Sequence, residues 1–124
     1  MKDFVRAAQA LSDETRLRIV NLIMSRECCV CEVMQALAVS QTRASRNLKI
    51  LYDAGFLEQR NDGLYTLYSM KEPAANDFHL DLLEAARKKL KDIAGAREDL
   101  ERLQAAERVG PGCNGQKGSV ACHS

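Results

Sequence analysis

The stretch Ser40-Gln41-Thr42-Arg43-Ala44-Ser45-Arg46-Asn47-Leu48-Lys49-Ile50-Leu51 decides the fold of this 124-residue chain. Ser40 is a good helix N-cap, and Ala44, Leu48 and Leu51 recur at helical spacing as one inward apolar stripe. The residues left facing outward are polar and include three positive charges. They are Gln41, Thr42, Arg43, Ser45, Arg46 and Lys49. This pattern is typical of a DNA-reading helix, with Ser40 at its start, and equally of a solvated amphipathic helix.

The segments on either side favour the DNA-reading interpretation. Apolar residues at helical spacing predict a helix over Val30–Leu37, so a tight turn before Ser40 gives a helix-turn-helix. Gly55 is placed to end the second helix, and residues 56–60 and 64–70 are expected to be strands joined by a turn at 61–63. A helix-turn-helix followed by a hairpin is the winged form. We expect Arg60 to contact DNA from the wing only weakly, because Asp62 opposes its charge.

The remaining segments predict helices. A short helix is expected around Phe4–Leu11, followed by a second that Ser12 caps, and a long continuous helix over residues 76–104. That long helix carries more apolar surface than the chain can cover, so we expect a homodimer through the first and last helices. The predicted fold is mainly α with a small β-hairpin, a dimeric winged helix-turn-helix over residues 1–106, with a flexible cysteine-containing tail over 107–124.

Bulk composition neither supports nor excludes nucleic-acid binding, because 18 Lys and Arg nearly balance 17 Asp and Glu. No apolar run of about 18 residues predicts a membrane span, and the N-terminus lacks the layout of a signal peptide, so we expect a cytoplasmic protein. Three of the five cysteines, Cys28, Cys29 and Cys31, lie within four positions. In a reducing compartment such a cluster indicates metal binding or redox activity rather than a disulfide framework.

Two local motifs resemble the ArsR/SmtB family of metal-responsive transcriptional repressors. Residues 27–33, Glu-Cys-Cys-Val-Cys-Glu-Val, resemble the Glu-Leu-Cys-Val-Cys-Asp-Leu box of its arsenic-responsive branch, and residues 40–48 resemble its recognition-helix pattern Ser-Gln-Pro-Lys-x-Ser-Arg-His-Leu. The resemblance implies a homodimer that binds a palindromic operator and is released when As(III) or Sb(III), as arsenite or antimonite, binds the thiolates.

The chain departs from the family pattern at several positions. Thr42 and Asn47 replace the usual proline and histidine, and Met34 stands where a third cysteine is often found. Asp77 and His79 match half of the family's zinc site on the last helix, but the second half falls on the apolar residues 90 and 93. We therefore interpret Asp77 and His79 as surface residues and expect no zinc site there.

Trivalent arsenic is soft and takes three thiolates, so the positions of the cysteines matter. On an intact helix residues i and i+2 lie about 200° apart, so Cys29 and Cys31 reach one ion only if the first turn unwinds. Cys28 and Cys31 can converge without unwinding. The helix dipole should lower the pKa of these thiols, whereas the charges of Glu27 and Glu32 should raise it. The third ligand can alternatively be Cys113 or Cys122, delivered by the glycine-rich tail of either subunit, unless these are an incidental pair.

The sequence is also compatible with other functions. A repressor of the same fold could use the cysteines as a redox switch or sense another soft metal. A bare dimeric interaction module is the remaining alternative. A thiol enzyme such as an arsenate reductase is not expected, because the βαβ frame or phosphate-cradling loop that it needs is missing from the sequence.

Overall fold

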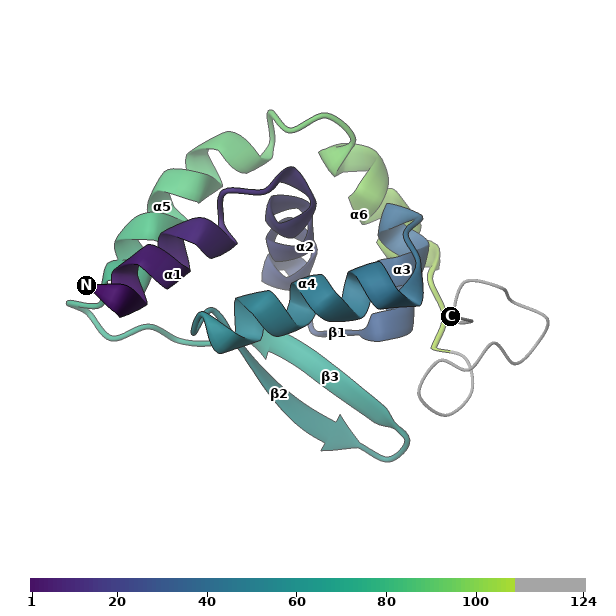
Figure 1. Cartoon of the computed structure of the whole chain (residues 1–124). Helices are drawn as coiled ribbons and strands as arrows, with labels where there is room; N and C mark the ends of the chain where they lie inside the picture. The colour runs from purple at the N-terminus through teal and green to yellow at the C-terminus, as the bar shows by residue number, and fades with distance from the viewer. Residues whose placement is uncertain (109–124) are drawn as a thin grey trace.

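The computed structural model describes residues 1–108, which form six helices and three strands around one core (Figure 1). In chain order these elements are α1 (Lys2–Ala10), α2 (Glu14–Ser25), β1 (Cys28–Cys29), α3 (Val30–Leu37), α4 (Gln41–Asp53), β2 (Leu57–Asp62), β3 (Tyr65–Met70), α5 (Phe78–Leu90) and α6 (Ala96–Ala105). None of the helices within residues 1–108 is long and apolar enough to cross a membrane. The predicted order of helix, helix, helix-turn-helix and hairpin is confirmed.

Helix α2 begins one residue later than expected. Asp13, not Ser12, is its N-cap, and the Asp13 carboxylate accepts a hydrogen bond of 3.0 Å from the amide of Arg16. The Ser12 hydroxyl instead donates to the carbonyl of Gln9, at 2.7 Å, and so closes the end of α1. Both residues are good caps, and their order along the chain does not decide which one is used.

The core lies between α2 and the helix-turn-helix. Ile19, Val20 and Leu22 of α2 are fully buried, as is the whole predicted inward stripe of α4. The tight turn between α3 and α4 is made by Ala38, whose backbone is left-handed with φ 58°. Ser40 caps α4 as predicted, since its hydroxyl accepts from the amide of Arg43 at 3.1 Å.

The wing is part of a three-stranded antiparallel sheet with the order β1-β3-β2. Strand β2 continues through Asp62, which pairs with Tyr65, so the turn is shorter than the expected 61–63 and centres on Gly63 with φ +62°. The third strand, β1, was not predicted. Cys28 pairs with Tyr68 and Cys29 with Leu67, so the cysteine segment is hydrogen-bonded directly to the wing.

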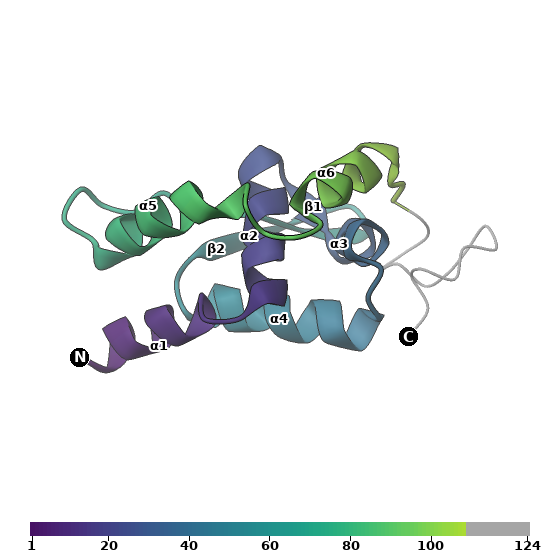
Figure 2. The ribbon, with the colours of Figure 1, turned by 90° about the horizontal axis from the view of Figure 1, so that it is seen from above.

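The prediction of one continuous helix over residues 76–104 is wrong. The chain turns after Leu90, and Gly95, with φ +85°, precedes a separate helix α6. Two side chains of α6 hold it against the body of the protein: buried Asp99 forms an ion pair of 2.7 Å with Arg18 of α2, and Arg102 Nε donates to the carbonyl of Ala36 in α3 at 2.7 Å. Helix α6 therefore packs alongside α3 instead of extending α5 (Figure 2).

Candidate nucleic-acid interface and thiol site

Helix α4 presents the residues that the sequence assigned to DNA. Ser40, Thr42, Arg43, Arg46 and Lys49 are exposed, and Gln41 and Ser45 are partly exposed. Within residues 1–108 the Arg46 guanidinium has no hydrogen bond or ion pair, so it is free to meet an external acceptor. Asp53, the acid near the end of α4, pairs with Lys49 at 3.1 Å.

Asn47 faces inward and positions the helix. It is 7% exposed, and its side-chain oxygen accepts a hydrogen bond of 3.0 Å from Arg16 of α2. Arg16 Nε also donates to the carbonyl of Ala10 at 2.7 Å, so one guanidinium joins α1, α2 and α4. Arg43 makes a second link to α2 by donating to Thr15 Oγ1 at 2.9 Å. Sequence reasoning missed Arg16 and Thr15, because their partners lie far along the chain.

The ion-pair partner of Arg60 is Glu27, not Asp62, the acid expected to offset its charge. The Arg60 guanidinium donates two hydrogen bonds, of 2.8 and 2.9 Å, to the carboxylate of Glu27, and this lowers the pKa of Glu27. Glu27 directly precedes Cys28. The wing is thus joined to the cysteine segment by a bidentate ion pair as well as by the strand pairing of β1 with β3.

The Sγ atoms of Cys29 and Cys31 lie 3.0 Å apart, and Cys31, unlike Cys29, is disulfide-bonded. Cys29 is the N-cap of α3, with extended backbone angles of φ −94° and ψ 171°, and only Cys31 lies on the helix. The expectation that these two side chains point to opposite sides of one helix is therefore wrong. They converge without any unwinding because the chain changes from strand to helix between them.

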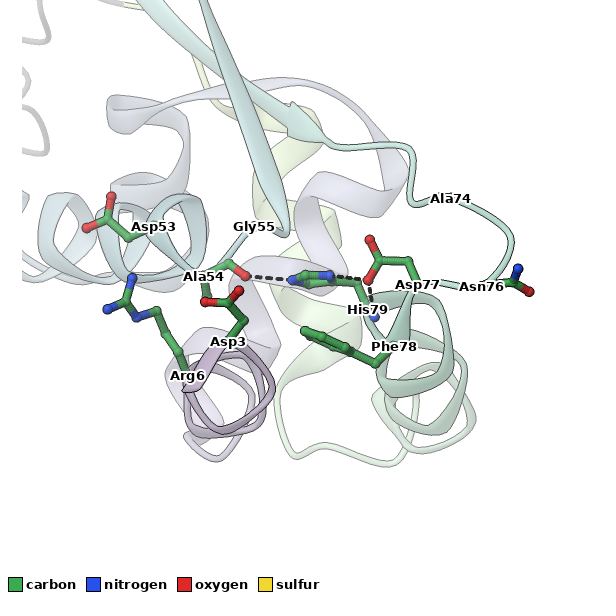
Figure 3. Close-up of a pocket in the computed structure, with 10 residues that line it drawn as sticks. All are labelled: Asp3, Arg6, Asp53, Ala54, Gly55, Ala74, Asn76, Asp77, Phe78 and His79. Carbon is green, nitrogen blue, oxygen red and sulfur yellow. Dashed lines mark hydrogen bonds and ion pairs between the residues drawn. The ribbon is translucent and has the colours of Figure 1, made fainter. Parts of the chain in front are cut away.

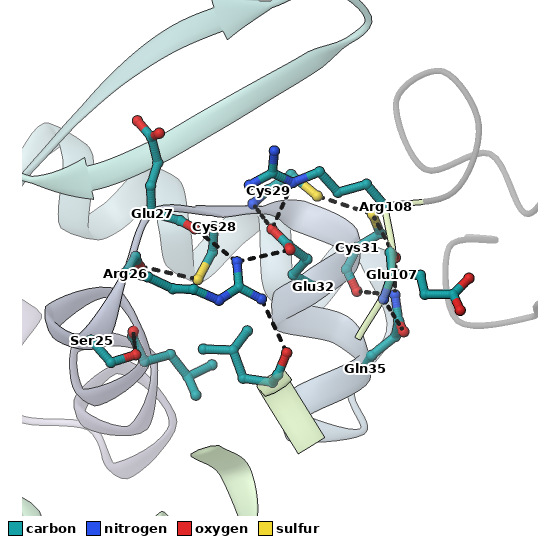
Figure 4. A network of polar contacts seen from close by, with 12 residues as sticks. Ser25, Arg26, Glu27, Cys28, Cys29, Cys31, Glu32, Gln35, Glu107 and Arg108 are labelled. Atoms are coloured by element: carbon teal, nitrogen blue, oxygen red, sulfur yellow. Dashed lines mark hydrogen bonds and ion pairs between the residues drawn. The ribbon is translucent and has the colours of Figure 1, made fainter. Parts of the chain in front are cut away.

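Cys28 points in the other direction (Figure 4). Successive residues of a strand face opposite sides, so Cys28 is buried in the main core, and its thiol donates to the carbonyl of Arg26 at 3.4 Å. Cys29 and Cys31 belong to a separate buried cluster with Leu67. The expected convergence of Cys28 with Cys31 is not observed. Cys113 and Cys122 lie outside the described residues.

Glu32 organises the surroundings of the thiol pair. It is 4% exposed and accepts hydrogen bonds from the amide of Cys29 at 2.9 Å, from Arg26 at 2.9 Å and from Arg108 at 3.1 Å (Figure 4). Burial alone would raise the pKa of Glu32, but these donors outweigh it, so the pKa is lowered and the side chain is a carboxylate at neutral pH. The sequence signal was present, since Glu32 is at the N3 position of a capping box.

The thiols are less acidic than expected. Burial, assisted by the charge of Glu32, raises the pKa of Cys28 to about 12. Burial also raises the pKa of Cys29 to about 11, against a hydrogen bond from the backbone of Glu32 that lowers it. The prediction that the helix N-terminus lowers thiol pKa values is wrong here, because desolvation dominates. A ligand that binds sulfur must displace these protons.

The chain that leaves α6 passes beside the thiol pair. The side chain of Gln35 in α3 donates to the carbonyl of Glu107 at 2.7 Å and accepts from its amide at 3.1 Å, so it hydrogen-bonds to both backbone groups of that residue. The Cys31 thiol lies 3.8 Å from the same carbonyl. The last described residue, Arg108, pairs with Glu32. The described part of the chain therefore ends beside Cys29 and Cys31.

A cavity of about 620 Å³ lies between α1, the end of α4 and the start of α5 (Figure 3). His79 points into this region with only 16% of its side chain exposed, so its interpretation as a surface residue is wrong. One ring nitrogen contacts the carboxylate of Asp77, the N-cap of α5, and the other lies 2.7 Å from the carbonyl of Ala54. The first contact holds the ring at the start of α5, and the second joins α5 to the end of α4.

The geometry defines a class of protein: a winged helix-turn-helix DNA-binding regulator, with an exposed basic helix α4 beside a β-hairpin. Residues 13–59 match the family model described as "Bacterial regulatory protein, arsR family". The chain is 33% identical over 98 residues to the "Probable mercury resistance operon repressor" of Streptomyces lividans, a match covering 79% of this chain and 75% of that protein. The chain belongs to the ArsR family of transcriptional repressors.

Two further similarities agree with this assignment. The chain is 41% identical over 63 residues to "Arsenic resistance transcriptional regulator ArsR1" of Pseudomonas putida, covering 50% of this chain and 49% of that protein. The fold matches the homodimeric winged helix-turn-helix DNA-binding domain of a possible ArsR-family regulator from Mycobacterium bovis, with a TM-score of 0.61, 26% identity and coverage of 73% of this chain and 80% of that one. Family and fold are those of DNA-binding regulators, not enzymes.

Proposed function

We propose that this repressor binds a palindromic operator as a homodimer and is released when arsenite or antimonite binds Cys29 and Cys31 in the reduced protein. The observation that carries the proposal is the 3.0 Å separation of the two sulfurs at the junction of β1 and α3. Soft trivalent ions prefer thiolate sulfur to the carboxylates nearby. Two thiolates and a third anionic ligand together balance the three positive charges of a trivalent ion.

The separation of the sulfurs favours a pyramidal ion over a linear one. With metal–sulfur bonds of about 2.3 Å, the length typical of zinc, a right-angled pair of bonds places the sulfurs about 3.3 Å apart, and a linear pair about 4.6 Å apart. The observed 3.0 Å is close to the first value. Trivalent arsenic and antimony form pyramidal complexes, whereas mercury(II) favours linear coordination by two thiolates. The geometry therefore supports the metalloids as inducers.

A third thiolate for inorganic arsenite is best supplied by the tail. Cys113 is five residues beyond Arg108, and a fully extended chain spans at most about 3.6 Å per residue, so roughly 18 Å is within its reach. Cys122 has a longer reach. Cys28 faces the core and would join the site only after β1 turned over and lost its pairing with β3.

Ligand binding would act on the wing and on the reading helix together. Cys29 belongs to the wing sheet, and Cys31 to the helix that precedes α4. An ion that fixes the distance between the two sulfurs thus shifts β1 relative to α3. A coupling of about 1 to 3 kcal/mol between the sites is ordinary for an allosteric protein and is sufficient for release.

The DNA-binding surface that we propose comprises the exposed residues of α4, with a smaller role for the wing. Arg43 and Arg46 can offer guanidinium forks to guanine or phosphate, and Gln41 can pair with adenine. Arg60 contributes to DNA binding only if it leaves Glu27. For the dimer we propose α1 and α5, because Phe4 and Val5 are 42% and 43% exposed on α1 and Phe4 packs edge-on against Phe78 of α5.

The test uses the full-length protein and an operator selected by it from a random DNA library, with release followed by fluorescence anisotropy. Arsenite should release wild type, whereas Cys29→Ser and Cys31→Ser should each lose the response. Cys28→Ser should keep it. Undiminished release from the Cys29→Ser, Cys31→Ser double variant would refute the proposal. Release by peroxide, with no response to arsenite under reductant, would favour the redox switch instead.

A further inference from the structure

A groove of about 300 Å³ lies between the middle of α4, which packs against β2, and the strands of the wing (Figure 1). This α4–wing groove is lined by Ser45, Lys49 and Tyr52 of α4, Gln59 of β2 and Tyr68 of β3. The three residues of α4 are four and three positions apart, so they share one face of the helix. Gln59 pairs with Tyr68, so both side chains lie on one face of the sheet. The reading helix and the wing therefore form the two walls of the groove.

Every side chain that lines the α4–wing groove can donate a hydrogen bond. Within residues 1–108 four of the five make no side-chain hydrogen bond: Ser45, Tyr52, Gln59 and Tyr68. Lys49 pairs with Asp53 at 3.1 Å, but the two side chains are 75% and 45% exposed, so the pair is weak and another anion can compete for the ammonium group. Asp53 itself lines the cavity beside α1 and not this groove. The groove thus offers free donors and a cation.

Tyr68 keeps its proton at neutral pH. Burial raises the pKa of its hydroxyl, and this effect outweighs the positive charge of Lys49, which lowers it. The wing therefore presents an O–H donor near the Lys49 ammonium group, and Tyr52, which is 40% exposed, presents a second hydroxyl from α4. Hydrogen bonds from such groups are strongest when the acceptor is ionised. The arrangement fits an anion with several oxygen atoms.

The position of the α4–wing groove indicates which anion it binds. A single sugar–phosphate backbone separates the major groove of DNA from the adjacent minor groove. When α4 enters the major groove and the wing lies along the minor groove, that backbone has to pass between them. The volume of about 300 Å³ exceeds the roughly 150 Å³ that holds a benzene molecule, so a phosphodiester group has room.

We propose that the α4–wing groove of each subunit binds one backbone phosphate of the operator; this inference rests on the proposed function, because it requires that α4 and the wing bind DNA. Tyr52 and Tyr68 donate their hydroxyls to the phosphate oxygens, and Lys49 supplies the positive charge. Gln59 adds an amide donor from β2. Because every nucleotide carries the same phosphate, this contact fixes the register of α4 in the major groove and leaves base preference to other residues.

The proposal gives the wing a contact with DNA that does not depend on Arg60. Successive residues of a strand face opposite sides, so Arg60 and Gln59 lie on opposite faces of the wing sheet. On its face Arg60 is held by Glu27 at 2.8 Å. The other face, toward α4, carries the neutral donors of the α4–wing groove. The wing can therefore bind the backbone while its ion pair with the cysteine segment stays intact.

The first experiment removes the hydroxyls one at a time. Tyr52→Phe and Tyr68→Phe should each weaken operator binding roughly tenfold, since each removes a hydrogen bond to a charged group. The same loss is expected on an unrelated duplex, and unfolding midpoints should not change, because neither hydroxyl has a partner within residues 1–108. Tyr65→Phe is the matched control, in the same hairpin but outside the groove lining, and should bind as wild type does. Wild-type affinity in both groove variants, or a loss confined to the selected operator, would overturn the inference.

The second experiment uses wild-type protein and modified DNA. Methylphosphonate linkages, which replace one charged phosphate oxygen with a methyl group, are placed at one backbone position at a time along the selected operator. We expect at least one position in each half-site to lower wild-type affinity strongly but to have little further effect on the Tyr52→Phe, Tyr68→Phe double variant. The two changes then remove the same contact and are not additive. Additive losses at every sensitive position would overturn the inference.

The salt dependence tests the role of Lys49. Lys49→Gln should reduce the slope of log affinity against log salt concentration by about 0.9 for each subunit, whereas the tyrosine variants should keep the wild-type slope, because a neutral hydroxyl releases no counterion. A wild-type slope in Lys49→Gln would overturn this role. If wild type binds its selected operator and arsenite releases it, while the groove variants behave identically, the proposed function stands and this inference fails. If wild type selects no DNA, both fail.

Discussion

Replacing Glu32 with glutamine should lower the stability of the fold and raise the reactivity of the neighbouring thiols. Glutamine keeps the shape and can still accept from the amide of Cys29, but it loses the charge that holds Arg26 and Arg108. A hydrogen bond to a charged group contributes about 1.5 to 3 kcal/mol. The two arginines are 38% and 32% exposed, so water recovers part of this. We expect a net loss of about 2 kcal/mol, which lowers Tm by roughly 8 °C for a domain of this size.

The same substitution, which lowers stability, should raise the reactivity of the thiols. The charge of Glu32 raises the pKa of both Cys28 and Cys29. Without it the pKa values fall, the thiolate fraction at a fixed pH grows and alkylation by iodoacetamide becomes faster. The assay is thermal unfolding at fixed protein concentration, together with the alkylation rate between about pH 7 and 9. Glu58→Gln, on the exposed face of β2, is the matched control and should change neither.

The dependence of stability on acid pH also tests the role of Glu32. The pKa of Glu32 is lowered in the folded protein, from a usual value of 4.5. The stability that its charge contributes is therefore present above pH 4.5 and is lost as the pH falls through the folded pKa. The difference in stability between wild type and Glu32→Gln should shrink on acidification. A stability loss without faster alkylation, or a gap that widens in acid, would refute this reasoning.

Other consequences can be tested separately. Because the pKa of Cys29 is about 11, Cys29 is protonated at neutral pH and its proton leaves with an arsenite hydroxyl as water, so inducer affinity should change little between about pH 6.5 and 8.5, measured by operator release. Arg46→Ala should weaken operator binding by about 1 to 3 kcal/mol at an unchanged Tm. Asn47→Ala should instead lower stability by about 1 to 2 kcal/mol and leave base preference unaltered, since Asn47 is buried and its partner is Arg16 of α2. Gly55→Ala should destabilise by more than about 1 kcal/mol, because φ is +95° and the added Cβ would lie 2.7 Å from His79 Nε2; equal unfolding midpoints would contradict this.

Features set by neighbouring residues could be predicted from the sequence. The stripe of Ala44, Leu48 and Leu51, the Ser40 cap and the end of α4 at Gly55 all depend on residues within a few turns of one another. The same information predicted the hairpin, although its turn was placed over three residues. These elements were sufficient to indicate the winged helix-turn-helix, and the comparisons with known proteins confirm it.

Features set by distant partners could not be predicted. Helix α6 turns back at Gly95 because Asp99 meets Arg18, and no local pattern indicates that pairing. The geometry of the thiol pair has the same origin: Cys29 is extended only because it pairs with Leu67 in the wing. A periodicity argument treats residues 28–31 as one regular element, and it fails where a strand meets a helix.

The pairing of β1 with β3 also affects how the protein is made. Strand β1 has only two residues and cannot persist without its neighbour, whose residues leave the ribosome well after Cys29. Until the hairpin has formed, the sulfurs of Cys29 and Cys31 have nothing to hold them together. A chain that has not yet formed its wing thus lacks the assembled form of the proposed inducer site, which arises in the same folding step as the wing.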